Sequence, residues 1–224
     1  MVIAWFDEIV TAVAPGRCPG CGGRGPAVCN ACLAKLRPAP TAPPPPPIAW
    51  WTACFAYEGV AREIIARAKY RQERAALRVL ARELPKAVAR APGAIDVVTF
   101  APASRARYLR TGVDHGAVIA RVVAEALGAP LRPLLGRRSG DGEQTGRDAA
   151  TRRRGPRVRA TVHVPPASIL LVDDVATTGG TLAAAARALL ASGARTVFAA
   201  TIARTPRPSG VHPIGAYTSE SNVR

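Results

Sequence analysis

Short apolar runs in this chain alternate with polar and glycine-rich stretches. Residues 169–172 are an unbroken apolar run, Ile-Leu-Leu-Val, which is typical of a strand covered on both faces. Two adjacent carboxylates, Asp173 and Asp174, end the run, and a Thr/Gly-rich loop follows. The Ala/Leu-rich stretch 182–190 then predicts a helix. Strand, loop and helix in this order indicate a unit of an open parallel sheet.

The same reading along the chain predicts several more strands and helices. Amphipathic or Ala/Leu-rich stretches predict helices over residues 3–14, 60–69, 73–90 and 112–127, with Pro85 a kink or break in the third. Apolar runs predict strands over residues 50–57, 95–100, 131–135, 161–164 and 195–204. We therefore expect an α/β fold with a mostly parallel sheet.

Proline marks a boundary between a small N-terminal module and the core. Residues 43–47 are five consecutive prolines, which indicates a semi-rigid spacer that holds the module off the core, although its helix can pack back. We expect four segments: a helix and four-cysteine module at 1–37, a Pro-rich linker at 38–47, the α/β core at 48–204, and a loosely ordered tail at 205–224.

The loop after the acidic pair has the features of an anion site. Ligands of open parallel sheets bind at the carboxyl ends of strands, where helix N-termini attract phosphate. The two carboxylates would repel a phosphate, so we expect them to hold ribose hydroxyls and Mg²⁺. A Walker loop and a G-x-G-x-x-G motif are both absent, and the alternative is a polar turn with the acids as helix-start charges. The predicted ligand-binding residues are Asp173, Asp174, Ala176, Thr177, Thr178, Gly179, Gly180 and Thr181.

A basic stretch follows the predicted strand 95–100. Residues 101–112 contain three arginines and lead into a helix, which predicts a second anion-binding loop. The candidates are Arg105, Arg107 and Arg110, each of which can equally be ordinary surface charge. The glycine- and arginine-rich stretch 136–159 predicts a long polar loop that is either functional or disordered.

Four cysteines near the N-terminus form two C-x-x-C pairs, Cys18 with Cys21 and Cys29 with Cys32. Four thiolates suit one tetrahedral structural Zn²⁺, although the gap between the pairs is shorter than the roughly 15–20 residues of a zinc ribbon. Coincidental buried cysteines and a redox pair are the alternatives. Cys54 has no partner thiol nearby in the sequence, and we expect it to be a small core residue.

The charge balance points to an anionic partner. The net charge is +16, and only Lys35, Lys69 and Lys86 are lysines, so arginine supplies most of it. A polyphosphate substrate and a nucleic acid both fit this charge. No apolar run approaches the ~20 residues of a membrane span, and residues 1–14 do not match a signal peptide, so we expect a cytoplasmic protein with reduced thiols.

The run from Ser168 to Thr181 resembles the ribose-phosphate signature of type I phosphoribosyltransferases. Together with the four cysteines, Tyr57-x-Gly59, Lys69-Tyr70 and Gln144, it resembles the ComF family of competence-associated proteins. That family commonly has Arg-Gly-Phe-Asn-Gln where this chain has Thr-Gly-Val-Asp-His at 111–115.

The resemblance implies a type I phosphoribosyltransferase-like fold with an N-terminal zinc module. It also implies phosphoribosyl pyrophosphate as ligand, with Mg²⁺. The acids would bracket the 2- and 3-hydroxyls of the ribose, the Thr/Gly loop would bind the 5-phosphate, and the basic loop would receive the pyrophosphate. The 136–159 loop falls where this class has a mobile lid. No residue identifies the acceptor.

Three functions fit these expectations. The first is a phosphoribosyltransferase. The second is a DNA-uptake accessory protein that binds single-stranded DNA or competence proteins. It would need exposed aromatic residues to stack on bases, and few are available in this sequence. The third is a sensor that binds phosphoribosyl pyrophosphate without turning it over.

Overall fold

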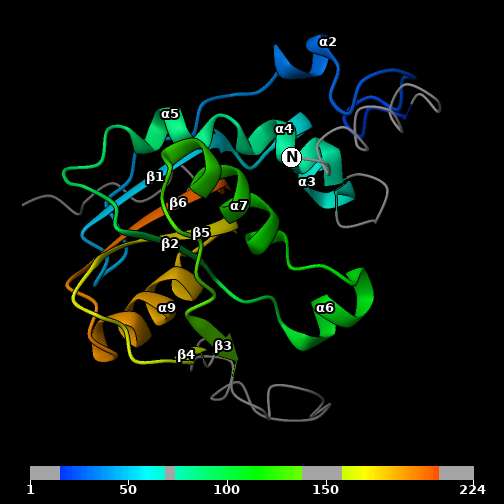
Figure 1. The fold of residues 1–224 in the computed structure, drawn as a ribbon. Helices are drawn as coiled ribbons and strands as arrows, with labels where there is room; N and C mark the ends of the chain where they lie inside the picture. Colours follow the sequence, from blue (N-terminus) through cyan, green and yellow to red (C-terminus); the bar gives the residue numbers. More distant parts are fainter. Residues whose placement is uncertain (1–15, 69–73, 138–157, 207–224) are drawn as a thin grey trace, which may run out of the picture.

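The computed structural model describes residues 16–68, 74–137 and 158–206 of the chain. A four-stranded parallel sheet forms its centre, with the strands in the order β1-β6-β5-β2 (Figure 1). The strands of this sheet are β1 (Trp50–Ala56), β2 (Val97–Phe100), β5 (Ser168–Ala176) and β6 (Thr196–Arg204), and the helices are α2 (Asn30–Leu33), α3 (Gly59–Arg67), α4 (Arg74–Ala81), α5 (Leu84–Val88), α6 (Arg105–Thr111), α7 (His115–Leu127) and α9 (Gly180–Ala191).

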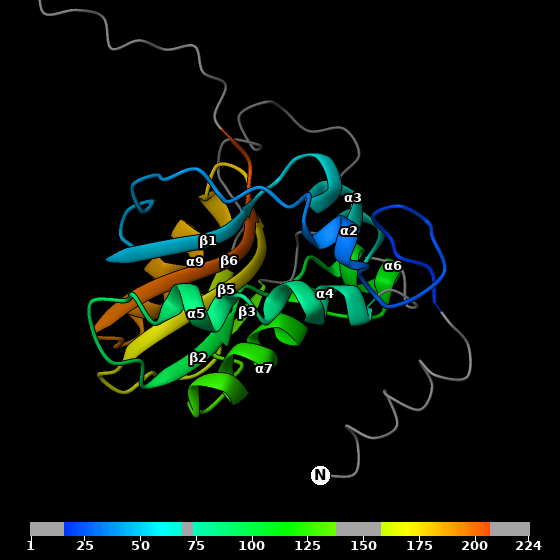
Figure 2. The same ribbon diagram turned by 90° about the horizontal axis from the view of Figure 1, so that it is seen from above.

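The apolar run of β5 is buried on both faces, as the sequence predicts. Leu170 and Val172 point into one core cluster, which also contains residues of α3, α4, α5 and α7. Ile169 and Leu171 point into a second cluster with α9. The sheet is therefore the middle of three layers, with α4, α5 and α7 on one face and α9 on the other (Figures 1 and 2).

The register of the sheet brings functional positions to one edge. Asp173 of β5 lies beside Thr201 of β6, and Phe100 at the end of β2 lies beside Val172. Because all four strands are parallel, the acids, the basic stretch after β2 and the end of β1 meet at the carboxyl edge of the sheet.

A small antiparallel pair lies beside this edge. It consists of β3 (Leu135–Arg137) and β4 (Val158–Ala160), so the predicted strands at 131–135 and 161–164 are wrong in position. Pro133 cannot donate a ladder hydrogen bond, and Leu131 forms only a single bridge to Val98.

Two other predictions differ in detail. The helix expected over 73–90 is divided into α4 and α5, with Pro85 in the first turn of α5, where proline is favoured. The basic stretch expected as a loop contains α6, which ends before Gly112 at φ 65°. The predicted helix 3–14, Lys69, Gln144, most of the 136–159 loop and the tail beyond Pro206 lie outside the described residues.

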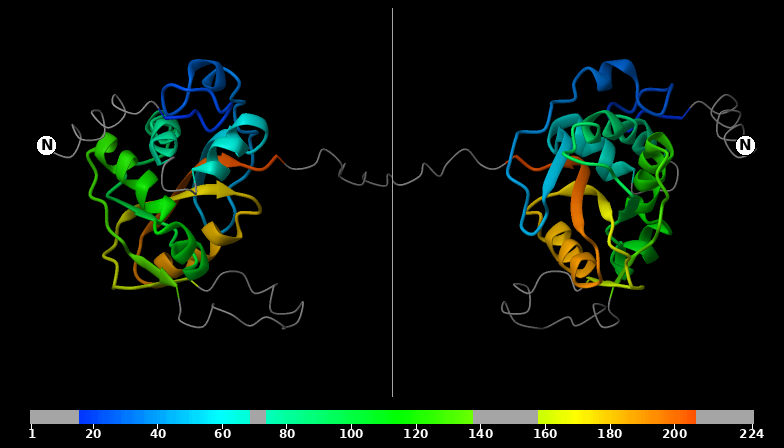
Figure 3. Two further views of the ribbon diagram at one scale, coloured as in Figure 1. Left: turned by 90° about the vertical axis from the view of Figure 1, so that its right-hand side faces the viewer. Right: turned by 60° about the vertical axis from the view of Figure 1, so that its left-hand side comes forward.

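The proline linker does not hold the cysteine module away from the core. Instead, its first residues pair with the outer edge of β1: Ala39 N–H donates to the Cys54 carbonyl at 3.0 Å, and Ala56 N–H donates to the Arg37 carbonyl at 2.9 Å. Farther along, Arg204 Nη1 donates to the Pro40 carbonyl at 2.9 Å. Figure 3 shows this segment along the side of the sheet.

The cysteine module packs directly on α3. Cys18 and Cys32 are buried in the same cluster as Ile64, and Arg67 Nη1 donates to the Pro19 carbonyl at 2.7 Å. Figure 2 shows α2 next to α3. Within the described part of the chain, no helix has the length and apolar character that a bilayer span requires.

Candidate functional site

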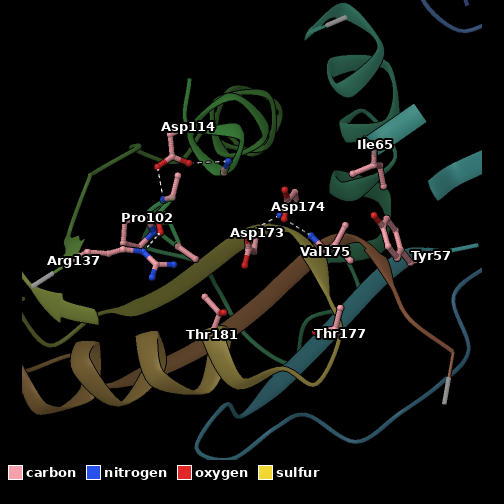
Figure 4. A pocket seen from close by; sticks show the side chains of 13 residues that line it. Tyr57, Ile65, Pro102, Asp114, Arg137, Asp173, Asp174, Val175, Thr177 and Thr181 are labelled. Atoms are coloured by element: carbon pink, nitrogen blue, oxygen red, sulfur yellow. Dashed lines mark hydrogen bonds between the residues drawn. The ribbon is translucent and has the colours of Figure 1, made fainter. Parts of the chain in front are cut away.

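A pocket of about 260 Å³ opens at the carboxyl edge of the sheet. The ends of β1, β2 and β5 form its floor, and α3, β3 and the first turns of α7 and α9 form its walls (Figure 4). Both predicted acids line it, and so do two residues of the predicted phosphate loop, Thr177 and Thr181. Residues that the sequence predicts to act together therefore lie around one cavity.

The two acids are buried and held by the backbone of their own strand. Asp173 is 9% exposed and its Oδ1 accepts from Asp174 N–H at 2.8 Å. Asp174 is 5% exposed and its Oδ1 accepts from Val175 N–H at 2.7 Å. Its other oxygen, Oδ2, lies 4.0 Å from Nδ1 of the buried His115. The pair thus presents carboxylate oxygens in fixed positions, which suits ribose hydroxyls or a hard cation.

A third carboxylate, Asp114, lines the pocket and organises its wall. Its Oδ1 accepts from Gly116 N–H at 3.0 Å as the N-cap of α7, and its Oδ2 accepts from Ala103 N–H at 2.8 Å. Gly116 allows a close approach, because a Cβ there would lie 3.0 Å from the Ala101 carbonyl oxygen. The N-cap carboxylate therefore fixes the chain after β2 against α7. Sequence reasoning did not single out Asp114, although an Asp directly before a helix is a recognisable N-cap signal.

The loop after β5 leads into the N-terminus of α9. Gly179 is the N-cap residue at φ 78°, a left-handed conformation that glycine adopts without steric cost, and α9 begins at Gly180. The side chains of Thr177 and Thr181 line the pocket, and Thr178 is exposed and accepts from Gly180 N–H at 3.4 Å. The N-terminus of a 12-residue helix favours an anion here.

Ala176 has a different role in this loop. It is 2% exposed, and its carbonyl accepts from Thr205 N–H at 3.0 Å. These contacts fix the start of the loop to the end of β6, and Ala176 is not among the residues that line the pocket.

An arginine that sequence reasoning did not single out reaches the pocket from β3. Arg137, the last residue of β3, lines the pocket, and its Nε donates to the Pro102 carbonyl at 3.0 Å. The sequence placed Arg137 in the 136–159 stretch, where the resemblance implies a mobile lid, but it did not single out this residue, because its approach to the pocket depends on how β3 packs. Of the predicted basic residues, Arg110 is exposed on α6 and does not line the pocket. The side chains of Arg105 and Arg107 lie outside the described residues.

The four cysteines come together as a candidate metal centre. Their sulfur atoms all lie within 4.8 Å of one another, and the Sγ atoms of Cys21 and Cys29 are 3.7 Å apart. A tetrahedral zinc with Zn–S bonds of about 2.3 Å requires S···S separations of about 3.8 Å. Cys18, Cys21, Cys29 and Cys32 therefore fit one zinc ion.

The thiols of this cluster differ in acidity. Burial opposes ionisation of Cys18, but backbone hydrogen bonds, the largest from Cys29, outweigh it and lower the pKa of this thiol to about 6. Burial and the neighbouring thiols raise the pKa of Cys32 to about 12. One thiol ionises readily, and the complete set ionises only with a cation to balance the charge. Outside the cluster, burial raises the pKa of Cys54, which packs against the core from β1, to about 12.

Comparison with known proteins shows the family to which this chain belongs. A family model for the phosphoribosyl transferase domain matches residues 112–223, half of the 224-residue chain. The chain belongs to the phosphoribosyl transferase domain family. The matched region contains Asp114, Asp173, Asp174 and the loop 176–181, while β1 and β2 precede it. The expected type I phosphoribosyltransferase fold with a parallel sheet is confirmed.

Several solved phosphoribosyltransferases are similar to this chain at low sequence identity. The glutamine phosphoribosylpyrophosphate amidotransferase from B. subtilis is 21% identical with a TM-score of 0.46, over 63% of this chain and 30% of its own. The purine phosphoribosyltransferase from Pyrococcus horikoshii Ot3 is 22% identical with a TM-score of 0.37, over 66% of this chain and 78% of its own. The chain thus spans about 30% of the amidotransferase. No curated protein matches the sequence.

Proposed function

We propose that this protein binds phosphoribosyl pyrophosphate and transfers its phosphoribosyl group to an acceptor, with release of pyrophosphate. The observation that carries the proposal is the shared pocket, in which Asp173 and Asp174 face the same cavity as Thr177 and Thr181. A ribose 5-phosphate has both groups that this arrangement suits: vicinal hydroxyls for the carboxylates, and a phosphate for the N-terminus of α9.

The residues act mainly by positioning and by charge. The acids hold the ribose while Thr177, Thr181 and the loop N–H groups hold the 5-phosphate, so the anomeric carbon is fixed over the pocket. Departure of pyrophosphate places positive charge on the ribose ring, and the two buried carboxylates stabilise it. Arg137 is the described cation that lines the pocket, and it supplies charge for the departing pyrophosphate.

Carboxylate oxygens and pyrophosphate together suit Mg²⁺. Asp173 and Asp174 supply oxygen ligands, the type that this ion prefers. When bound, Mg²⁺ would neutralise charge on the pyrophosphate.

We also propose that the chain is a ComF-type member of its family, on the strength of the four-cysteine cluster that precedes the domain. The cluster would hold structural zinc, with its thiols reduced in the cytoplasm. A role in single-stranded DNA binding is less well supported. Tyr108, at 53% exposed, is the one strongly exposed aromatic among the described residues, and base-stacking surfaces need several.

Calorimetry with phosphoribosyl pyrophosphate and Mg²⁺ tests the proposal, followed by a pyrophosphate-release assay with candidate acceptors. We expect wild-type binding, and Asp174→Asn should weaken it by roughly ten- to a hundred-fold, because a charge-assisted hydrogen bond contributes ~1.5–3 kcal/mol. Binding without release for any acceptor would instead favour the sensor.

The matched control for this substitution is Asp96→Asn. Asp96 accepts from Ser168 N–H at 2.8 Å near the opposite end of the sheet, so this variant should keep wild-type affinity. Equal affinities of wild type and Asp174→Asn would reject the assigned site, and so would a wild type that does not bind.

A further inference from the structure

The two pocket acids belong to opposite faces of the sheet. Successive side chains of a strand alternate between its faces, and in β5 Val172 packs on the α7 side while Leu171 packs on the α9 side. Asp174 therefore lies on the α7 side, and Asp173 lies on the side of α9, which carries Thr181. Figure 4 shows this division. Each acid thus has its own surroundings, and a residue that supports one of them need not support the other.

On the α7 side, a buried histidine faces Asp174. His115 is the first residue of α7 and is 3% exposed. Its Nδ1 lies 4.0 Å from Asp174 Oδ2, while Asp174 Oδ1 accepts from Val175 N–H at 2.7 Å. His115 is not among the residues that line the pocket, so it acts on a ligand through Asp174.

The backbone that carries His115 is fixed against the sheet. Asp114 caps α7 by accepting from Gly116 N–H at 3.0 Å. Gly116 packs so closely on the end of β2 that a Cβ would lie 3.0 Å from the Ala101 carbonyl oxygen. β2 in turn pairs with β5 up to two residues before Asp174. The histidine and the acid are therefore held side by side by the packing of α7, β2 and β5.

A carboxylate as buried as Asp174 is stabilised by hydrogen-bond donors at both of its oxygens. Val175 N–H serves Oδ1. The imidazole faces Oδ2 from a distance about 1 Å longer than a typical N–H···O hydrogen bond. Hydrogen bonds at functional sites are often long in the absence of ligand and tighten when it binds. A small rotation of either side chain would close this gap.

We propose that His115 is a positioning residue for the ribose, an inference that rests on the proposed function. When the ribose binds, Nδ1–H of His115 donates to Asp174 Oδ2 and fixes the carboxylate against the sugar. The remaining lone pairs of the carboxylate accept from a ribose hydroxyl. Both the neutral ring with its proton on Nδ1 and the imidazolium can donate this bond, so the role does not require the histidine to titrate.

Calorimetry with ribose 5-phosphate tests this role through variants of His115. His115→Leu removes the donor and keeps a branched side chain of similar size. We expect it to weaken binding by roughly tenfold, the lower end of what a hydrogen bond to a charged group contributes. His115→Gln retains an N–H donor and should recover most of the affinity. If His115→Leu does not fold, His115→Met takes its place, because methionine is apolar and adapts to irregular space.

A double-mutant cycle shows whether the histidine acts through the acid. Asp174→Asn removes the charge that His115 holds, so adding His115→Leu to it should weaken binding further by no more than about twofold. Thr181→Ala is the matched comparison. Because Thr181 lines the pocket from α9, its effect and that of His115→Leu should multiply. A histidine with a purely structural role would give no such contrast.

The outcomes separate this proposal from the proposed function. If Asp174→Asn weakens the binding of ribose 5-phosphate but His115→Leu does not, the role of His115 is overturned and the proposed function stands. The same follows if His115→Gln binds as weakly as His115→Leu, or if the effects of His115→Leu and Asp174→Asn multiply. If wild type binds neither ribose 5-phosphate nor phosphoribosyl pyrophosphate, the proposed function fails and the role of His115 with it.

Discussion

At the scale of single residues, Gly179 joins the phosphate loop to the linker. It has φ 78°, and a Cβ placed on it would lie 2.8 Å from Cγ of Pro45. A side chain at this position would therefore meet both backbone strain and a neighbouring proline ring. The proline-rich segment thus packs directly against the loop that we assign to the 5-phosphate.

We expect Gly179→Ala to destabilise the protein and to weaken the binding of ribose 5-phosphate. A left-handed alanine costs roughly 1–2 kcal/mol, which corresponds to a fall in Tm of about 2–8 °C for a chain of this size. Thermal unfolding and calorimetry measure the two effects. For Tm, Gly180→Ala is the matched control. Gly180 is in α9, where its nearest contact would be at 3.4 Å, so this alanine should not lower Tm. An unchanged Tm for Gly179→Ala would contradict the argument.

Local sequence is enough to bring some of the pocket residues together. The acids and the two pocket threonines lie within nine residues of one strand–loop–helix unit, so their spacing alone brought them together. Arg137 and Tyr57 reach the same pocket from β3 and from the end of β1. Their approach depends on the packing of distant elements, which local patterns do not contain.

At the scale of secondary structure, α3 connects the cysteine module to the pocket. One part of the helix meets the module: Val60 lies against Gly20, and Arg67 donates to the Pro19 carbonyl. Another part faces the pocket through Ile65. The position of the apolar pocket wall therefore depends on the packing of the module.

We expect purified protein to contain one zinc per chain and Cys32→Ser to lose it. Because Cys32 is buried in the cluster that contains Ile64, the loss should lower Tm and disturb α3. Elemental analysis and thermal unfolding measure both effects. Cys54→Ser is the matched control. Cys54 lies on β1 and is not one of the four clustered cysteines, so this variant should retain full zinc content. Zinc-free wild type, purified without chelators, would reject the metal site.

The helices and strands that the sequence predicted best are those with one strong hydrophobic pattern. β5, α9 and β6 follow continuous apolar or Ala/Leu-rich runs, and the structure has them close to the expected places. The secondary structure of the basic stretch after β2 was harder to predict. We expected a loop there because of its arginines, but arginine is also a good helix former, and the stretch contains the helix α6.

At the scale of the whole molecule, the N-terminal segments and the core are closely joined. The linker and the cysteine module contact β1, α3 and the loop before α9. We expect a shortened protein that begins at Ile48 to be less stable than the full chain and to form larger species, because it loses all of these contacts. Thermal unfolding and light scattering at several concentrations measure this. A shortened protein that stays monomeric with the Tm of the full chain would show that the contacts contribute little.

The pairing of the linker with β1 has a consequence for self-association. β1 is the outermost strand on its side of the sheet, and an uncovered outer strand can recruit a strand from another molecule. Residues 37–39 occupy hydrogen-bonding positions at the end of β1, and the prolines that follow have no N–H groups to donate to a further strand. The linker therefore covers the end of β1 and hinders the addition of a strand from another molecule at this position.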